Sequence, residues 1–267
     1  MTTTDVQFAG SIPERYDEYL VPLFFEPYAE DLARRASELR ARRVLDVAAG
    51  TGVVTQALLR AIPDAEIDAT DLNPEMLARA ASRVQSPRVR WSPADAMRLP
   101  FEDGRFDLVA CQCAVMFFPD RAAAFREARR VLAPGGAYLV SVWDDLARNE
   151  VARIVNDAVA SLFPQAPPDF MARVPHGHGD PLRIERELRA GGFAQVECEA
   201  VSRRSRAASA RDAALGVCEG TPLRHEILAR DPAGLPRAVE SATRALRAEL
   251  GDGAVDAEMR AFVFTCR

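Results

Sequence analysis

The sequence predicts an α/β fold built around a Rossmann-like, doubly wound sheet. Two observations support this prediction. Five short segments between residues 44 and 143 have the pattern of strands, each of them ends in a turn, and most of them are followed by a helical pattern. A glycine turn at 50–52 closes the first apolar segment and leads into a helix. Strands that alternate with helices in this way form right-handed βαβ units, and such units build a parallel sheet.

The core strands are expected at residues 44–49, 66–71, 89–94, 106–112 and 137–143. The first and the last are apolar throughout, which is typical of strands buried on both faces of a sheet. Helices are expected between the strands, at 51–62, 74–83 and 120–132. Asn73 and Asp120 are expected N-caps, and Pro74 occupies the first helical position after Asn73. The segment 133–136 (APGG) is expected to form the turn before the fifth strand.

The segments on either side of this core show a looser pattern. Residues 1–30 are rich in aromatic side chains, and prolines divide them into short helical pieces ahead of a helix at about 27–40. After residue 143 the expected elements are a helix at 149–163, a loop rich in proline and histidine at 164–181, a helix at 182–190, a strand at 195–201, helical segments at 209–250 and a last strand at 261–266.

Composition and charge narrow the classes of function. The chain has 267 residues, a net charge of −5 and 34 basic residues, all of them arginine. Without lysine there is no lysine Schiff-base chemistry and no Walker-type phosphate loop. The negative charge disfavours a nucleic acid or an anionic membrane surface as partner. No apolar run approaches the roughly 18–20 residues of a membrane span, and the N-terminus lacks the pattern of a secretory signal.

The cysteines indicate no covalent framework. There are five of them, and only Cys111 and Cys113 lie close together in the sequence. Their spacing fits neither a disulfide scaffold nor a Cys-x-x-Cys zinc site, so no metal site is predicted. Reduced thiols in a cytoplasmic protein are the favoured interpretation.

The strongest functional signal is the segment DVAAGTG (46–52) at the end of the first strand. Glycines there let backbone N–H groups approach a ligand closely, at the N-terminus of the following helix. Asp71 ends the next strand, where a carboxylate can accept both ribose hydroxyls of an adenosine ligand. Asp95 and Ala96 follow the third strand, where a carboxylate can accept an amino N–H of adenine.

Taken in order, VLDVAAGTG, TDLNPEML, ADAMRLPFEDGRFDLV and the helix from FPD to RRVLAPGG resemble the class I S-adenosylmethionine (SAM)-dependent methyltransferases. The ubiquinone/menaquinone-biosynthesis and small-molecule group is the most similar, and the match covers about 40–143. The resemblance implies a mostly parallel seven-stranded sheet with an antiparallel last strand and a helical cover. It also implies one methyltransferase domain, divided into an N-terminal lid (1–40), a SAM-binding core (41–143), an acceptor side (144–260) and the last strand (261–267).

The resemblance also implies SAM as the cofactor and a role for each matched residue. Asp46 orders the glycine turn that carries the methionine end of SAM, and Asp71 holds the ribose. Other matched positions line the turn, contact the adenine, lie near the sulfonium or close over SAM: Ala48, Gly50, Gly52, Leu72, Met76, Asp95, Ala96, Met97, Cys111, Gln112, Tyr16 and Tyr19. For the two tyrosines, simple packing of an N-terminal helix is an equally good interpretation.

The implied reaction transfers the SAM methyl group to a small acceptor and leaves S-adenosylhomocysteine. The cofactor carries the difficult chemistry, and a base is needed only where the acceptor must lose a proton. His176 and His178 are candidate bases, although a polar loop histidine without a catalytic role is the commoner case. An apolar or aromatic acceptor, in secondary metabolism, is expected, with candidate contacts at Phe117, Phe118, Phe170 and Arg224.

Other classes of function remain open at this level. A glycine turn with an acid about 20 residues later also describes NAD(P)-binding oxidoreductases, but Thr55 stands where their third glycine would be. A SAM-binding protein without catalysis would need the same pocket. A nucleic-acid methyltransferase is disfavoured because no Asn-Pro-Pro-Tyr-type tetrad follows the fourth strand. The expected protein is a monomer or a homodimer.

Overall fold

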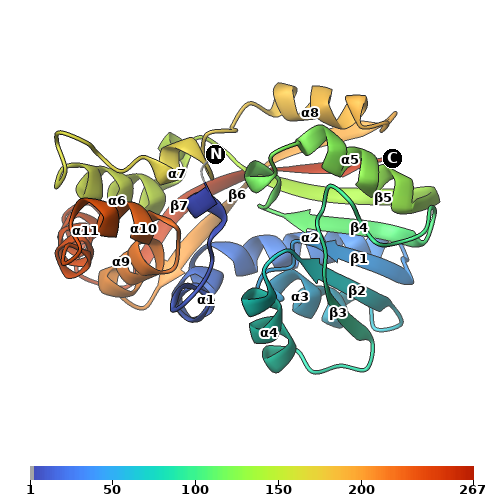
Figure 1. Cartoon of the computed structure of the whole chain (residues 1–267), viewed down its shortest axis with the longest axis horizontal. Helices are drawn as coiled ribbons and strands as arrows, with labels where there is room; N and C mark the ends of the chain where they lie inside the picture. The colour runs from blue at the N-terminus through green and yellow to red at the C-terminus, as the bar shows by residue number, and fades with distance from the viewer. Residues whose placement is uncertain (1–2) are drawn as a thin grey trace. The chain divides into compact units, whose positions relative to one another are not determined.

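The computed structural model describes residues 3–267 and contains a seven-stranded sheet with the strand order β3-β2-β1-β4-β5-β7-β6 (Figure 1). Strands β1 to β5 pair in parallel with their neighbours in this order, whereas β7 pairs antiparallel with β5. The predicted fold class is therefore confirmed. The strands are β1 (Arg43–Val47), β2 (Glu66–Asp71), β3 (Val89–Pro93), β4 (Phe106–Gln112), β5 (Leu132–Trp143), β6 (Val196–Ala207) and β7 (Val255–Cys266).

Tertiary contacts divide the chain into two compact units that interleave along the sequence. Unit 2 comprises Tyr28–Trp143, Asp180–Val201 and Ala261–Arg267, and it holds the strand–helix core. Unit 1 comprises the chain up to Pro27, Asp144–Gly179 and Ser202–Arg260. The interpretation of the whole chain as a single domain stays a prediction.

The helices of unit 2 begin and end where the sequence signals indicate. They are α2 (Glu26–Glu38, which starts in unit 1), α3 (Val53–Ala61), α4 (Pro74–Arg83), α5 (Arg121–Val131) and α8 (Pro181–Ala190), with a short 3₁₀ turn, η3 (Val115–Phe117). The side chain of Asn73 accepts from the first turn of α4, and that of Asp120 does so for α5, as expected. Because these caps satisfy backbone donors that the helix leaves open, they locate the helix starts.

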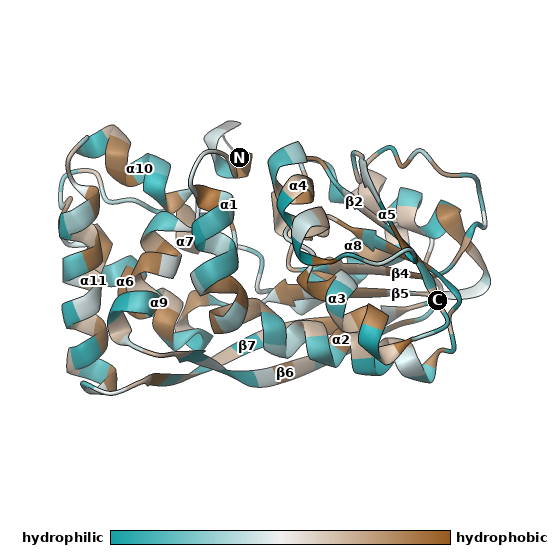
Figure 2. Ribbon diagram, turned by 90° about the horizontal axis from the view of Figure 1, so that it is seen from below, coloured by the Kyte–Doolittle hydropathy of each residue, from teal (hydrophilic) through white to brown (hydrophobic). Residues whose placement is uncertain are grey.

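Unit 1 is built from helices and the outer ends of β6 and β7. Its helices are η1 (Thr3–Val6), α1 (Ile12–Arg15), the π-helix η2 (Tyr16–Phe25), η4 (Leu146–Arg148), α6 (Glu150–Ala160), α7 (Phe170–Arg173), α9 (Ala210–Glu219), α10 (Leu223–Arg230) and α11 (Leu235–Leu250). Apolar residues recur every three or four positions along α11, and its coloured ribbon in Figure 2 alternates accordingly. Such a stripe is the face that a helix buries.

Two expectations about the strands need correction. Residues 133–136 were expected to form a turn before the fifth strand, but they lie within β5. The pairing of β5 with β4 shifts register there, and Gly135 takes φ +79°. The last strand begins at Val255, six residues before the expected start. Charged side chains at 256, 258 and 260 alternate there with buried ones at 255, 257 and 259. A strand with one solvated face shows this alternation, which is easily missed when only apolar runs are sought.

No helix in the described part of the chain combines the length and the apolar character that a membrane span requires.

Candidate functional site

The turn between β1 and α3 has an unusual backbone. Ala48 and Gly50 both have φ +56°, and Gly52 has φ +83°. Left-handed backbone is common for glycine but costs of order 1 kcal/mol or more for alanine, so Ala48 must be held by its surroundings. Two hydrogen bonds hold it there: the Ala49 amide donates to the Thr70 carbonyl at 2.8 Å, and the Gly52 amide donates to the Ala49 carbonyl at 2.9 Å.

The two glycines of the turn differ in what surrounds them. A Cβ atom on Gly50 would meet only the Met76 methyl group, at 3.6 Å. A Cβ atom on Gly52 would lie 2.9 Å from Cη2 of Trp91 and 3.2 Å from Cβ of Ala80. Gly52 therefore allows α3 to pack closely beside α4 and β3. Only Gly50 leaves space at the turn that a ligand could use.

Asp71, the last residue of β2, joins the glycine turn to the start of α4. Its Oδ2 accepts from the Gly50 amide at 2.8 Å, and its Oδ1 accepts from the Asn73 amide at 2.8 Å. Burial raises the pKa of Asp71 above its usual value, and the amides of Asn73 and Gly50 oppose that shift. Each oxygen of a carboxylate has a second lone pair, so Asp71 can still accept from two hydroxyl groups.

Asp46 is a buried carboxylate beneath the same turn. Thr55, one turn into α3, donates its hydroxyl to Oδ2 at 2.6 Å. Oδ1 of Asp46 and the hydroxyl of Thr51 are buried and have no hydrogen-bond partner among the described residues. Burial, together with the nearby charge of Asp71, raises the pKa of Asp46 to about 7. A buried acceptor without a donor is costly in free energy, which points to a missing ligand group at this position.

The carboxyl end of β4 supplies buried thiols instead of exposed ones. Cys111 is fully buried and hydrogen-bonds with Tyr138, and burial raises the pKa of its thiol. Cys113 takes φ +49°; its amide donates to the Ser141 carbonyl at 3.0 Å, and its thiol lies 3.4 Å from the Ser141 hydroxyl. Gln112 between them is 8% exposed. Both thiols are protonated at neutral pH, because burial raises the pKa of Cys113 to about 12.

The remaining core candidates lie at the carboxyl ends of β2 and β3. Asp95 accepts from the Met97 amide at 2.8 Å, which leaves its other oxygen for a ligand. Leu72 is 68% exposed, an unusual environment for a leucine, whereas Met76 is buried against the glycine turn. Ala96 is partly exposed. The carboxyl ends of β2 and β3 therefore offer two carboxylates, Asp71 and Asp95, and the exposed side chain of Leu72. An adenosine site needs such polar groups and apolar surface, whereas Met76 and the two thiols are buried.

Histidine 176 is buried in unit 1. Its Nδ1 lies 2.9 Å from the Asp144 carbonyl oxygen. A carbonyl oxygen only accepts, so we assign the proton of the neutral ring to Nδ1, which leaves Nε2 as the basic nitrogen. Burial lowers the pKa of His176 to about 4. The ring is therefore neutral at physiological pH and is a weak base.

The other candidates are distributed over both units. Tyr16 and Tyr19 lie on η2 in unit 1, where Tyr16 stacks on Phe25 with ring centroids 5.0 Å apart and the Arg15 guanidinium lies 5.6 Å from the Tyr19 ring centre. Phe170 is 2% exposed within unit 1. Partly exposed candidates are His178 and Arg224 in unit 1 and Phe117 and Phe118 in unit 2. Their proposed contacts with cofactor or acceptor stay predictions.

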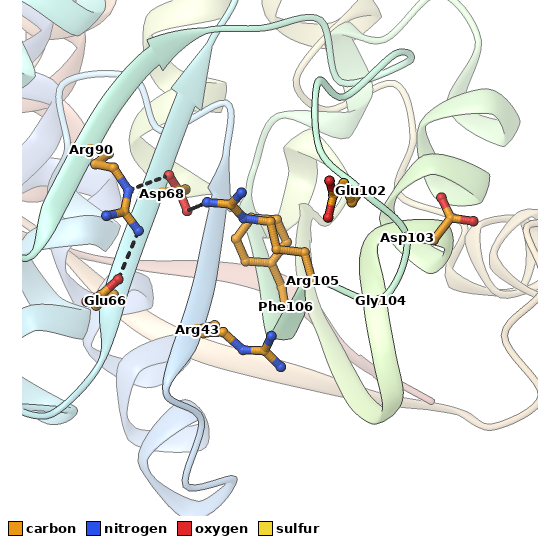
Figure 3. Close-up of a pocket in the computed structure, with 9 residues that line it drawn as sticks. All are labelled: Arg43, Glu66, Asp68, Arg90, Glu102, Asp103, Gly104, Arg105 and Phe106. Carbon is orange, nitrogen blue, oxygen red and sulfur yellow. Dashed lines mark hydrogen bonds and ion pairs between the residues drawn. The ribbon is translucent and has the colours of Figure 1, made fainter.

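A cavity of about 390 Å³ lies at the opposite edge of unit 2, at the amino ends of β1, β2 and β4 (Figure 3). Arg90 bonds to Glu66 at 2.9 Å and to Asp68 at 3.1 Å, and Arg105 bonds to Asp68 at 3.1 Å. These charges neutralise one another within the cavity. Its lining contains none of the residues predicted from the sequence, so we do not assign it to the cofactor.

Three residues of the site escape sequence reasoning. The sequence shows only that Thr55 stands where the third glycine of an NAD(P)-binding motif would be. In the structure its hydroxyl donates to Asp46. Thr51 is hidden between the two glycines, and Ser141 is a polar residue in an apolar strand that meets Cys113. Among the described residues, no group of three or more histidine, cysteine or acidic side chains is arranged to hold a metal ion.

Comparison with known proteins places residues 44–136 in a family of methyltransferase domains. Over 133 residues the chain is 41% identical to malonyl-[acyl-carrier protein] O-methyltransferase of Halorhodospira halophila. This match covers 49% of this chain and 44% of that protein. Over 107 residues it is 41% identical to demethylmenaquinone methyltransferase of Thermus thermophilus. This match covers 39% of this chain and 49% of that protein. The chain thus spans less than half the length of either curated relative.

Among solved structures, phosphoethanolamine N-methyltransferase 2 of Haemonchus contortus, determined with S-adenosyl-L-methionine, superposes with a TM-score of 0.62. The match covers 100% of this chain and 60% of that one at 17% identity. At this identity the likeness shows the fold alone.

Proposed function

We propose a function from the premise that residues 44–136 belong to the methyltransferase domain family, within the class I SAM-dependent methyltransferases. The resemblance seen in the sequence is confirmed for this core. In our proposal the chain transfers a methyl group from SAM to a small, apolar or aromatic acceptor and releases S-adenosylhomocysteine. The NAD(P)-dependent alternative is not favoured by the family match.

The observation that carries the proposal is a set of three carboxylates at the carboxyl ends of β1, β2 and β3. SAM offers three kinds of hydrogen-bond donor: the ribose hydroxyls, the adenine amino group and the ammonium of its methionine end. Asp71 and Asp95 suit the first two, because each keeps acceptor capacity at the carboxyl ends of β2 and β3. The buried Oδ1 of Asp46 then suits the ammonium, which is the remaining strong donor.

When bound, SAM supplies an electrophilic methyl group on its sulfonium. The residues of the chain bind and orient it: the Gly50 turn leaves room for the methionine end, and Asp71 fixes the ribose. Orientation of the two reactants can lower the barrier by several kcal/mol. The thiols of Cys111 and Cys113 stay protonated and take no part as nucleophiles.

The acceptor is proposed from unit 1 and not from the relatives. All of unit 1 lies outside the matched residues 44–136, so the relatives' acceptors do not transfer to this chain. The aromatic side chains of η2 and its neighbours favour an apolar or aromatic small molecule. A small aromatic diol such as menadiol is therefore the first acceptor to test. We further propose that the protein is a monomer or a homodimer, that it is cytoplasmic and that it acts in secondary metabolism.

Ligand binding tests the cofactor assignment. We expect S-adenosylhomocysteine to bind with micromolar affinity and NADH not to bind, as measured by isothermal titration calorimetry. The reverse order would establish the oxidoreductase alternative. Transfer of tritium from labelled SAM to menadiol, or to components of a cell extract, would then separate an enzyme from a SAM-binding protein without catalysis.

The lowered pKa of His176 leads to a prediction about pH. If Nε2 served as the base, the rate of methyl transfer would rise with pH through about 4 and be flat above it. We therefore expect no histidine-like step between pH 6 and 8 in the rate measured at saturating SAM with a fixed acceptor. His176→Gln should leave the affinity for S-adenosylhomocysteine within about twofold, and a rate step near pH 6.5 that this variant removes would contradict the assignment.

A further inference from the structure

Asp46 is buried and Asp71 is partly exposed, and the charge of Asp71 acts on Asp46. Both oxygens of Asp71 accept a backbone N–H, from Gly50 and from Asn73. Asp46 accepts one hydroxyl hydrogen, from Thr55, and its other oxygen has no partner among the described residues. Amides donate to both oxygens of Asp71 and stabilise its charged form, whereas one oxygen of the more deeply buried Asp46 has no donor, so Asp46 is the carboxyl group that more readily holds a proton.

The surroundings of Asp46 add no positive charge. In the described part of the chain, the ionisable groups that act on it are Asp71 on β2 and the thiol of Cys111 on β4. Helix α3 contributes the hydroxyl and the backbone amide of Thr55, which are both neutral. Cys111 is protonated, and Tyr138, which hydrogen-bonds with it, is protonated as well because burial raises its pKa. Negative charge on Asp46 is therefore opposed by Asp71 and by burial, with no cation to offset them.

We propose that Asp46 is protonated in the unliganded protein, that the ammonium group of the cofactor expels this proton, and that Asp46 thereby selects adenosyl ligands that carry a cationic amino group. The proposal rests on the proposed function. The O–H bond of the Asp46 carboxyl group breaks and the proton leaves to solvent. The ligand's N–H group then donates to the carboxylate oxygen that was left without a partner, so charge is balanced inside the cleft.

The direction of the pH dependence follows from the unliganded state. Burial raises the pKa of Asp46 to about 7, and a bound cation lowers it. Below pH 7 the ligand must displace a proton, so its affinity falls by up to tenfold for each further pH unit. Between pH 8 and pH 6 we expect the dissociation constant of S-adenosylhomocysteine to rise about tenfold.

Calorimetry with two ligands tests the proposal directly. S-adenosylhomocysteine carries the amino group, whereas 5′-methylthioadenosine has the same adenosine and a thioether but no amino group. Titrations at pH 6.5 in phosphate and in imidazole, whose ionisation enthalpies differ, count the protons released. We expect about 0.8 proton for S-adenosylhomocysteine and none for 5′-methylthioadenosine.

Three variants make the test specific. Asp46→Asn should bind S-adenosylhomocysteine at least tenfold more weakly at pH 8, release no proton and show no pH dependence. Thr55→Val removes the hydrogen bond that favours the charged form of Asp46, so it should move the pH dependence to higher pH. Asp95→Asn is the matched control: it should weaken binding and keep the proton release.

The outcomes separate the two proposals. Binding of S-adenosylhomocysteine without proton release, or equal release by Asp46→Asn, would overturn the role of Asp46 and leave the proposed function standing. Failure of S-adenosylhomocysteine to bind would overturn both. Thermal unfolding of each variant shows whether it is folded, and if Asp46→Asn is not, the shift in Thr55→Val decides the question.

Discussion

Replacing Asp71 by alanine is expected to weaken the binding of S-adenosylhomocysteine about 100-fold or more. In the proposed complex Asp71 accepts two hydrogen bonds from ribose hydroxyls, and hydrogen bonds to charged groups contribute about 1.5–3 kcal/mol each. The Gly50 amide also loses its acceptor, so the turn that carries the methionine end is less well ordered. Isothermal titration calorimetry at pH 8, where Asp46 is ionised, measures the change.

The matched control for this variant is Asn73→Ala. Asn73 accepts from the amides of Glu75 and Met76, and its loss should destabilise α4 by about 1 kcal/mol while leaving ligand affinity within threefold. The comparison separates loss of a ribose contact from disturbance of the helix start. Unchanged affinity in Asp71→Ala would refute the ribose assignment.

Replacing Gly52 by alanine is expected to lower the free energy of unfolding by about 2–4 kcal/mol. The new methyl group would lie 2.9 Å from Trp91 and 3.2 Å from Ala80, and the backbone at φ +83° is strained for any residue with a side chain. Both effects act on the folded state. Urea unfolding monitored by circular dichroism measures the loss.

Two further variants show which effect dominates. Gly253→Ala should change the free energy of unfolding by no more than about 0.5 kcal/mol, because its added Cβ has no neighbour within 4 Å and its φ is not left-handed. In Gly52→Ala/Trp91→Phe the shorter ring lacks the atom that clashes, so part of the stability should return. A fully additive double variant would mean that backbone strain alone is responsible.

The strand–helix core of unit 2 was largely predictable because its signals are local. Asn73 followed by Pro74 is a helix start at short range, and the structure places the cap and α4 there. Apolar runs at 44–49 and 106–112 correspond to strands buried on both faces, which need no information about neighbours. The order of these elements is also what makes residues 44–136 resemble methyltransferase domains.

The start of β7 and the N-terminal helix η2 were less predictable, because their sequences carry weaker local signals of secondary structure. Residues 255–260 alternate charged and buried side chains, and their place in β7 depends on pairing with a strand far away in the sequence. The π-helical path of Tyr16–Phe25 likewise has no short-range signature beyond the presence of Pro22. This path packs against Gly216 of α9 and against Gly220, the residue that caps α9. A Cβ atom added to Gly216 would lie 3.0 Å from Tyr19, and one added to Gly220 would lie 3.1 Å from Tyr16.

The sequence by itself determined the order of strands and helices, the glycine turn and the acid at the end of the second strand, because hydrophobic period, capping residues and turn residues act over a few positions. Only the tertiary structure decided that Gly52 serves packing while Gly50 faces open space. It alone also decided that Thr55 donates to Asp46 and that the second oxygen of Asp46 is left without a donor. These features depend on distances between segments and on exclusion of water, and neither is encoded in the spacing of residues along the chain.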